Sequence, residues 1–258
     1  VVSGLIVVDF FAFRHKIPWI GKKIKEPSPL SKAVVRVIIK WATLPEEPEL
    51  RQQVIQHQED WITPFPGSGV VFFESDTHYY VLTAAHVLNR FMVSRARLAP
   101  EVSVSIADGS LYPAHVVVYC HQWPPDIAVI KFPKGGIVQE HICVVPLGRA
   151  DVLKKALGGK VVVLGHPWEE EEGEFVAKLL STKEQERLVF KPGMSSGGSG
   201  GALLYKGLVV GIATHKHRIE GSGRAVSNET IIEVFEKILK GDTEGFDVSI
   251  DESDRVAL

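Results

Sequence analysis

The sequence has few cysteines and almost no net charge. Only Cys120 and Cys143 occur among its 258 residues, which excludes a framework of several disulfides as the source of stability. Whether these two pair is left open, and free buried thiols are the simpler expectation. The 29 basic and 31 acidic residues give a net charge of −2. No nucleic-acid partner is expected, because electrostatic binding to phosphates needs an excess of basic residues.

The sequence also lacks a long uninterrupted apolar run. Its first thirteen residues are apolar apart from Ser3 and Asp9, and basic residues follow from Arg14 onward. A membrane-spanning helix needs about 20 apolar residues, and a signal peptide carries its positive charge before the apolar run. Two roles for this N-terminal stretch therefore stay open: membrane association, or an ordinary strand or packing segment. Nothing in the composition indicates a compartment.

Short runs rich in β-branched and aromatic residues recur from residue 67 onward, separated by turn residues. This pattern is typical of antiparallel strands. The predicted strands are 70–73, 79–83, 102–106, 114–119, 127–132 and 142–146, followed by 160–164, 175–180, 187–190, 202–205, 208–213 and 224–226. Two sets of six at this spacing indicate an all-β chain with two antiparallel barrels, rather than βαβ units.

The two ends of the chain differ from this pattern. A proline-rich stretch over residues 26–66 contains one strand-like run at 34–41, and we expect an extension that wraps around the main body. Asn228 is expected to cap a helix that has one apolar face and stops at Gly241. The predicted division is an extension at 1–61, a first barrel at 62–146, a second barrel with the helix at 147–241, and an acidic, mobile tail at 242–258.

Three separated segments supply the parts of an acyl-transfer site. Ser199 lies in a Gly-Gly-Ser-Gly-Gly run, His86 follows an apolar strand, and Asp126 precedes another. A serine hydroxyl needs an imidazole to take its proton and a carboxylate to orient that imidazole. Glycines let the chain turn so that the N–H groups of Gly197 and Ser199 can meet an oxyanion.

The segments 82–86, 126–132 and 197–203 resemble the trypsin-like (chymotrypsin-fold) serine proteases, and in particular their HtrA-like, disulfide-poor members. The resemblance extends over residues 62–241. It implies two Greek-key barrels and a serine endopeptidase that forms an acyl-enzyme through His86, Asp126 and Ser199. It further implies a protein or peptide substrate and no cofactor. Oligomerisation, frequent among the relatives, stays open.

The nucleophile has a second candidate. The usual phrase of this family, Pro-Gly-x-Ser-Gly-Gly, would select Ser196, which also precedes two glycines. Ser199 is preferred because Gly200 and Gly201 lead directly into the strand that should follow the nucleophile. Ser196 remains the alternative.

Substrate contacts are expected on both sides of the nucleophile. In the resembling family, the loop before it floors a pocket, and a later edge strand pairs with the substrate backbone. The corresponding residues are Gly193 and Met194 in the loop and Thr214, His215 and Lys216 on the strand. No metal site is expected, because His166, His215 and His217 lack zinc-site spacing with any cysteine.

Two other functions stay open. Gly-x-Ser-x-Gly is also the nucleophile elbow of α/β-hydrolase esterases, although that fold needs a strand-to-helix turn at the serine and the order Ser, Asp, His. A protease-like scaffold that binds peptides without cleaving them is the second alternative, since the sequence alone does not bring three distant side chains together.

Overall fold

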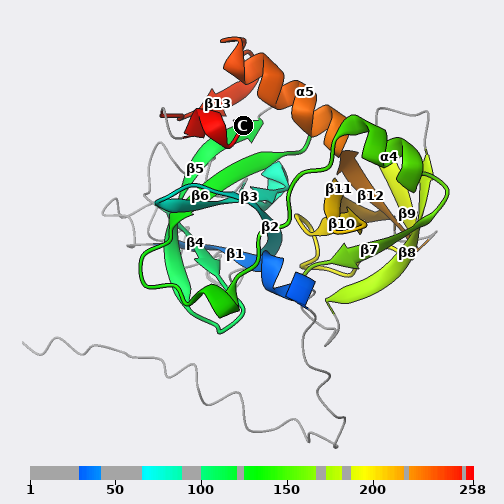
Figure 1. Cartoon of the computed structure of the whole chain (residues 1–258), viewed down its shortest axis with the longest axis horizontal. Coiled ribbons are helices and arrows are strands. Elements are labelled where there is room, and N and C mark those ends of the chain that lie inside the picture. The colour runs from blue at the N-terminus through cyan, green and yellow to red at the C-terminus, as the bar shows by residue number, and fades with distance from the viewer. Residues whose placement is uncertain are drawn as a thin grey trace, which may run out of the picture.

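The computed structural model describes residues 29–41, 66–88, 100–120, 125–166, 173–181, 187–217, 221–251 and 254–258. It contains two closed antiparallel barrels that lie side by side (Figure 1). The first barrel has β1 (Val34–Trp41), β2 (Gly67–Glu74), β3 (His78–Thr83), β4 (Pro100–Ser105), β5 (Leu111–Cys120) and β6 (Ala128–Pro133). The second has β7 (Lys160–Leu164), β8 (Glu174–Ser181), β9 (Arg187–Lys191), β10 (Ala202–Tyr205), β11 (Leu208–His217) and β12 (Ser222–Ser227).

Both barrels have the same topology. The neighbour order is β4-β1-β2-β3 in the first and β10-β7-β8-β9 in the second, which is the fourth-beside-first arrangement of a Greek key. Each ring is closed by the two remaining strands, with β5 pairing to β6 and β11 to β12. The predicted all-β, two-barrel fold class is confirmed.

The first barrel takes its sixth strand from a different place than predicted. Residues 142–146 form no strand; their contact with the barrel includes the Val145 N–H, which donates to the Val71 carbonyl. The sixth strand is β1, which pairs antiparallel with both β2 and β4. The division at residue 61 therefore has to be corrected, because residues 34–41 belong to the first barrel rather than to an extension.

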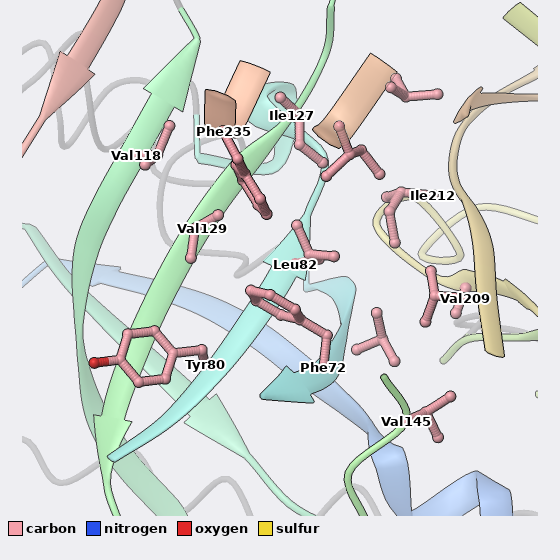
Figure 2. Packing of buried hydrophobic residues seen from close by; sticks show 14 of the residues in the cluster. Phe72, Tyr80, Leu82, Val118, Ile127, Val129, Val145, Val209, Ile212 and Phe235 are labelled. Atoms are coloured by element: carbon pink, nitrogen blue, oxygen red, sulfur yellow. The ribbon is translucent and has the colours of Figure 1, made fainter. Parts of the chain in front are cut away.

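Alternating side chains of single strands pack into different apolar clusters. Val71 of β2 lies inside the first barrel, whereas its neighbours Val70 and Phe72 pack into a cluster between the barrels (Figure 2). In β10, Leu203 lies inside the second barrel while Leu204 joins the cluster between the barrels. Because strand side chains alternate between faces, one apolar strand packs one face into its own barrel and the other face against the second barrel.

The helices α4 and α5 pack on the barrels. α4 (Ala150–Ala156) precedes β7, and α5 (Asn228–Leu239) follows β12 and crosses over both barrels (Figure 1). Phe235 of α5 contacts Phe72 of the first barrel, with ring centroids 6.1 Å apart. The α5 cap differs from the prediction. Ser227 is the N-cap and accepts from the Thr230 N–H, while the Asn228 side chain donates to Gly148 and Arg149 carbonyls at the start of α4.

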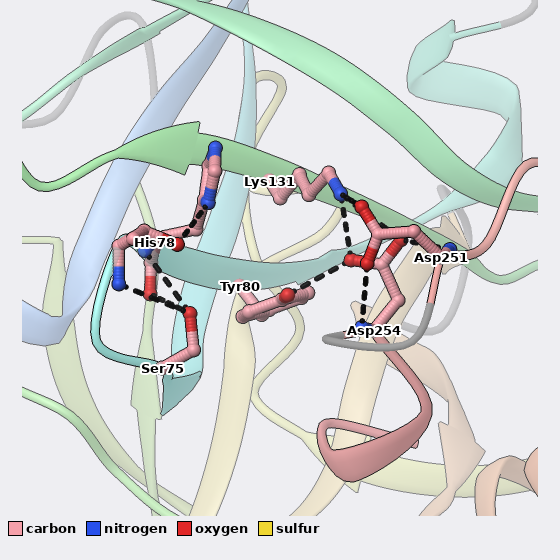
Figure 3. A network of polar contacts seen from close by, with 7 residues as sticks. Ser75, His78, Tyr80, Lys131, Asp251 and Asp254 are labelled. Carbon is pink, nitrogen blue, oxygen red and sulfur yellow. Dashed lines mark hydrogen bonds and ion pairs between the residues drawn. The ribbon is translucent and has the colours of Figure 1, made fainter.

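The acidic C-terminal segment docks on the first barrel, contrary to the expected mobile tail. β13 (Phe246–Val248) pairs with β5, and a 3-10 turn at Asp254–Val256 buries Asp254 completely. The Asp254 carboxylate accepts from the Tyr80 hydroxyl and from Lys131 Nζ, each at 2.8 Å (Figure 3). Burial alone would lower the pKa of Lys131, but hydrogen bonds to Asp254 and Asp251 raise it. Two acidic residues of this segment, Asp251 and Asp254, therefore form a specific ion-pair network with Lys131.

Residues 1–28 lie outside the described residues, so the expectation for the N-terminus is not addressed. None of the helices in the described part of the chain has the length and apolar character needed to cross a bilayer. Both Cys120 and Cys143 are free thiols, which answers the question of their pairing.

Replacing Asp254 by alanine is expected to lower the free energy of unfolding by about 3 kcal/mol, because removing one partner of a buried ion pair leaves the other without compensation. Asp251→Ala is the control. Asp251 also bonds Lys131 but its side chain is 59% exposed, so the loss should be about 1 kcal/mol or less. Urea unfolding of both variants measures the difference, and equal losses would contradict the assigned role of Asp254.

Candidate active site

His86 and Asp126 meet at one edge of the first barrel. Thr83 at the end of β3 pairs with Ala128 at the start of β6, so the turn after β3 and the loop before β6 emerge together. His86 Nδ1 donates to Asp126 Oδ2 at 2.6 Å, and the His86 backbone N–H donates to Oδ1 at 2.9 Å. The carboxylate therefore fixes both the ring and the backbone of His86.

The environment of this pair is asymmetric. The Asp126 side chain is only 2% exposed, whereas that of His86 is 36% exposed. A carboxylate held on Nδ1 places the ring proton there and leaves Nε2 as an acceptor. Burial, and secondarily the negative charge of Asp126, raises the pKa of the nearby Tyr119 hydroxyl. The buried carboxylate thus fixes the orientation of a partly exposed imidazole ring.

The glycine run around Ser199 forms a tight loop rather than a flexible linker. Within the described residues, the N–H groups of Gly198, Gly200 and Gly201 each donate to a backbone carbonyl, whereas those of Gly197 and Ser199 have no acceptor. Gly197 and Gly200 have φ values of +88° and +87°, a backbone conformation that residues with a side chain rarely adopt. The loop thus leaves two alternate amides available for a ligand.

Ser199 lies against β11, on the side where His86 is found. Its hydroxyl donates to the Thr214 carbonyl at 2.8 Å, at a bulge of β11 between Ala213 and His215. The His215 ring then contacts the His86 ring, with centroids 5.0 Å apart. The structure therefore brings the Ser199 loop and the His86–Asp126 pair to one place, although the Ser199 hydroxyl bonds Thr214 rather than His86.

Ser196, the alternative nucleophile, is exposed. In the described part of the chain it makes no side-chain hydrogen bond to His86, Asp126 or β11. Its neighbour Ser195 accepts from the Gly198 N–H at 3.1 Å, so this stretch forms the turn that leads into the glycine loop. The contacts of Ser199 with β11 are the feature that separates the two serines.

The other predicted substrate residues have different positions. Gly193 packs against the backbone of β12, where its N–H donates to the Gly221 carbonyl at 2.8 Å. Met194 is only 6% exposed, and its Sδ–Cε end packs beneath the loop against Gly165 and Gly198. Lys216 pairs with Gly223 in the sheet, and its side chain lies outside the described residues. Met194 thus supports the loop from the core of the second barrel.

Ser68 of β2, which the sequence analysis did not select, contacts the same loop from the first barrel. Its N–H donates to the Ser199 carbonyl at 2.7 Å, and its hydroxyl donates to the Gly197 carbonyl at 2.8 Å. The available signal was a small polar residue between two glycines, Gly67 and Gly69, at the start of a buried strand. That signal indicates close packing but not its partner.

Three side chains at the site could also act as metal ligands. His86, Asp126 and His215 offer ligand atoms that all lie within 4.8 Å of one another. The three residues come from separate segments of the chain. A search for zinc-site spacing in the sequence therefore does not detect them. His86 and Asp126 already bond to each other, an arrangement that suits proton transfer as well as a ligand with its carboxylate support.

Comparison with known proteins agrees with this architecture. Residues 67–212, more than half of the chain, match the trypsin-like peptidase domain, whereas a search of curated proteins found no match. The fold is similar to the HtrA-type protease AlgW with a decapeptide, at 19% identity and a TM-score of 0.58, covering 83% of this chain and 66% of that one.

Two further structures share the fold. The serine endoprotease from Yersinia pestis is 24% identical with a TM-score of 0.56, covering 82% of this chain and 64% of that one. Deg5 is 19% identical with a TM-score of 0.55, covering 82% and 91%. The chain therefore spans slightly less than two thirds of AlgW and of the Yersinia pestis protein.

The family match, the two Greek-key barrels and the neighbouring HtrA-type structures lead to one conclusion: the chain belongs to the trypsin-like peptidase family.

Proposed function

We propose that this chain is a serine endopeptidase in which Ser199, His86 and Asp126 form the catalytic triad. The observation that carries the proposal is the short bond between His86 Nδ1 and the buried Asp126 carboxylate, placed beside the loop of Ser199. In the family to which the chain belongs, this pairing orients the base that activates serine.

The mechanism assigns one task to each group. His86 Nε2 takes the Ser199 proton while Oγ attacks the substrate carbonyl carbon, and Asp126 stabilises the resulting imidazolium. The N–H groups of Gly197 and Ser199, which bond no acceptor among the described residues, donate to the developing oxyanion. His86 then gives its proton to the leaving amine, the acyl-enzyme remains on Ser199, and water attacks it by the reverse sequence.

The resting bond from Ser199 to the Thr214 carbonyl is compatible with this role. Catalytic hydrogen bonds are often absent or poorly aligned before substrate binds, and a serine hydroxyl changes partner by rotation about a single bond. His215, directly after Thr214, already contacts the His86 ring. The proposal therefore requires the Ser199 hydroxyl to turn from Thr214 toward His86 during the reaction.

A polypeptide is the proposed substrate. β10 pairs with β11 only as far as Ile212, whereas β12 pairs with β11 up to His217. The backbone of Ala213 is bonded to Gly200 and Gly201 of the glycine loop, so an extended peptide would add to the β11 edge beyond Ala213, next to His86, and use main-chain hydrogen bonds for binding. The peptide bound to AlgW supports this substrate class by analogy.

The α/β-hydrolase alternative is wrong for this chain. That fold requires a serine on a strand-to-helix turn, whereas the Ser199 loop leads into β10 of a closed antiparallel barrel. The non-cleaving scaffold predicts the same fold but no turnover, so activity measurements separate it from the proposal.

Ser199→Ala is expected to lower kcat for a peptide substrate by about 10⁶-fold, the scale seen when a serine protease loses its nucleophile. Ser196→Ala is the matched control and should keep kcat within about 3-fold of the unchanged protein, because the exposed Ser196 side chain makes no hydrogen bond to His86 or Asp126 among the described residues. Steady-state hydrolysis of a fluorogenic peptide library measures both. Loss of activity in the Ser196 variant alone would reverse the assignment.

Asp126→Asn is expected to lower kcat by about 10⁴-fold with little change in the melting temperature. An amide at this place keeps the shape of the pair but favours the wrong tautomer of His86, as the same change does in chymotrypsin-type enzymes. The same assay and a thermal melt measure the two quantities. A variant that keeps more than a tenth of the original kcat would show that Asp126 does not orient the base.

A further inference from the structure

Ser68 uses all its polar groups to hold the Ser199 loop and its surroundings, although it lies on the other barrel. It is completely buried. Besides its two bonds to the loop, its hydroxyl accepts from the His166 N–H at 2.8 Å, and its carbonyl accepts from the Thr83 hydroxyl at 2.7 Å. A buried serine with this many partners is costly to replace, because each partner is then left unsatisfied.

The two loop bonds bracket one of the proposed oxyanion donors. The Gly197 carbonyl belongs to the peptide unit that joins residues 197 and 198, and the Ser199 carbonyl belongs to the unit that joins 199 and 200. Between these two units lies the one that carries the Ser199 N–H. Because peptide units are planar and rigid, fixing the units on both sides limits the directions in which the Ser199 N–H can point.

The same contact explains the strict need for glycine at position 200. A Cβ atom there would overlap with the Ser68 carbonyl oxygen and the Thr83 hydroxyl. The φ of Gly200 is also +87°. The loop therefore lies directly on the backbone of β2, with no side chain between them.

The hydroxyl of Ser68 is itself held from the second barrel. His166 follows β7, whose last residue, Leu164, pairs with Ala202 just after the glycine loop. His166 Nε2 lies 3.1 Å from the Val34 carbonyl, and burial lowers the pKa of this imidazole, so the neutral ring donates to that carbonyl. A continuous chain of bonds thus runs from β1 through His166 and Ser68 to Gly197.

We propose that Ser68 is a positioning residue for the oxyanion-binding loop, which it holds in the geometry that aims the Ser199 and Gly197 amides at one point. The proposal rests on the proposed function for its kinetic consequence. Its structural consequence, an ordered loop, does not depend on catalysis.

Ser68→Ala is expected to lower kcat by about 10- to 100-fold while KM changes by less than about 2-fold, because a misaimed donor weakens binding of the transition state but not of the substrate. Affinity for a peptide aldehyde, which forms an oxyanion on the enzyme, should fall by the same factor as kcat. Ser227→Ala is the matched control. It removes a buried, hydrogen-bonded serine that caps α5, so it should lower the melting temperature and leave kcat unchanged.

Hydrogen exchange separates this inference from the proposed function. Exchange of the amides in residues 193–204, followed by mass spectrometry, should speed up in Ser68→Ala and stay unchanged in Ser227→Ala, whether or not the protein cleaves peptides. If the alanine variant does not fold, Ser68→Cys, which keeps the size and a weaker donor, should show a smaller change of the same kind. Unchanged exchange, or parallel losses of kcat in the Ser68 and Ser227 variants, would overturn the role of Ser68.

Discussion

The site depends on how closely the two barrels approach each other. His86 and Asp126 come from the first barrel, whereas Ser199 comes from a loop of the second, so the proposed triad can assemble only when the barrels are in register. The apolar cluster between them, with Phe72, Leu204 and Ile212 among its members, supplies a large but non-directional attraction. Such an attraction brings two surfaces together without fixing hydroxyl and imidazole to within hydrogen-bond distance.

The contact of the Ser199 loop with β2 fixes how the two barrels are oriented at the site. Ser68 binds the carbonyls of Gly197 and Ser199, and Gly200 permits that approach because it has no side chain. On the opposite side, the β11 bulge presents the Thr214 carbonyl to Ser199 and the His215 ring to His86. The Ser199 loop, in which four of five residues are glycines, is therefore held by hydrogen bonds from both barrels.

Much of this could be predicted from the sequence because it depends on local patterns. Short runs rich in β-branched and aromatic residues, separated by turn residues, predicted eleven of the twelve barrel strands, and the order of His86, Asp126 and Ser199 predicted a common site. The pattern is clearest where both faces of a strand are buried, as at Val70 and Val71, since such a strand is a continuous apolar run. The glycine run around Ser199 also leads directly into β10, as the sequence predicts.

The remaining features depend on partners that are distant in the chain. The proline-rich segments around β1 predict an extension, but β1 pairs with β2 and β4 and therefore belongs to the first barrel. Asp254 lies in an acidic stretch whose composition predicts mobility, but hydrogen bonds from Lys131 and Tyr80, which are distant in the chain, hold it in place. Asn228 is a residue type that favours the N-cap, but its side-chain amide bonds the carbonyls before α4, and Ser227 takes the cap instead. In each case the local sequence fits two environments.

The central claim is that Ser199, rather than Ser196 or no residue, is the nucleophile activated by His86. Labelling the unchanged protein with a fluorophosphonate and mapping the modified peptide tests it most directly, because this reagent forms a stable bond with an activated serine. The account predicts a single modification on Ser199 that requires His86. Modification of Ser196, or an unmodified protein under conditions in which a trypsin-like protease is fully labelled, would contradict it.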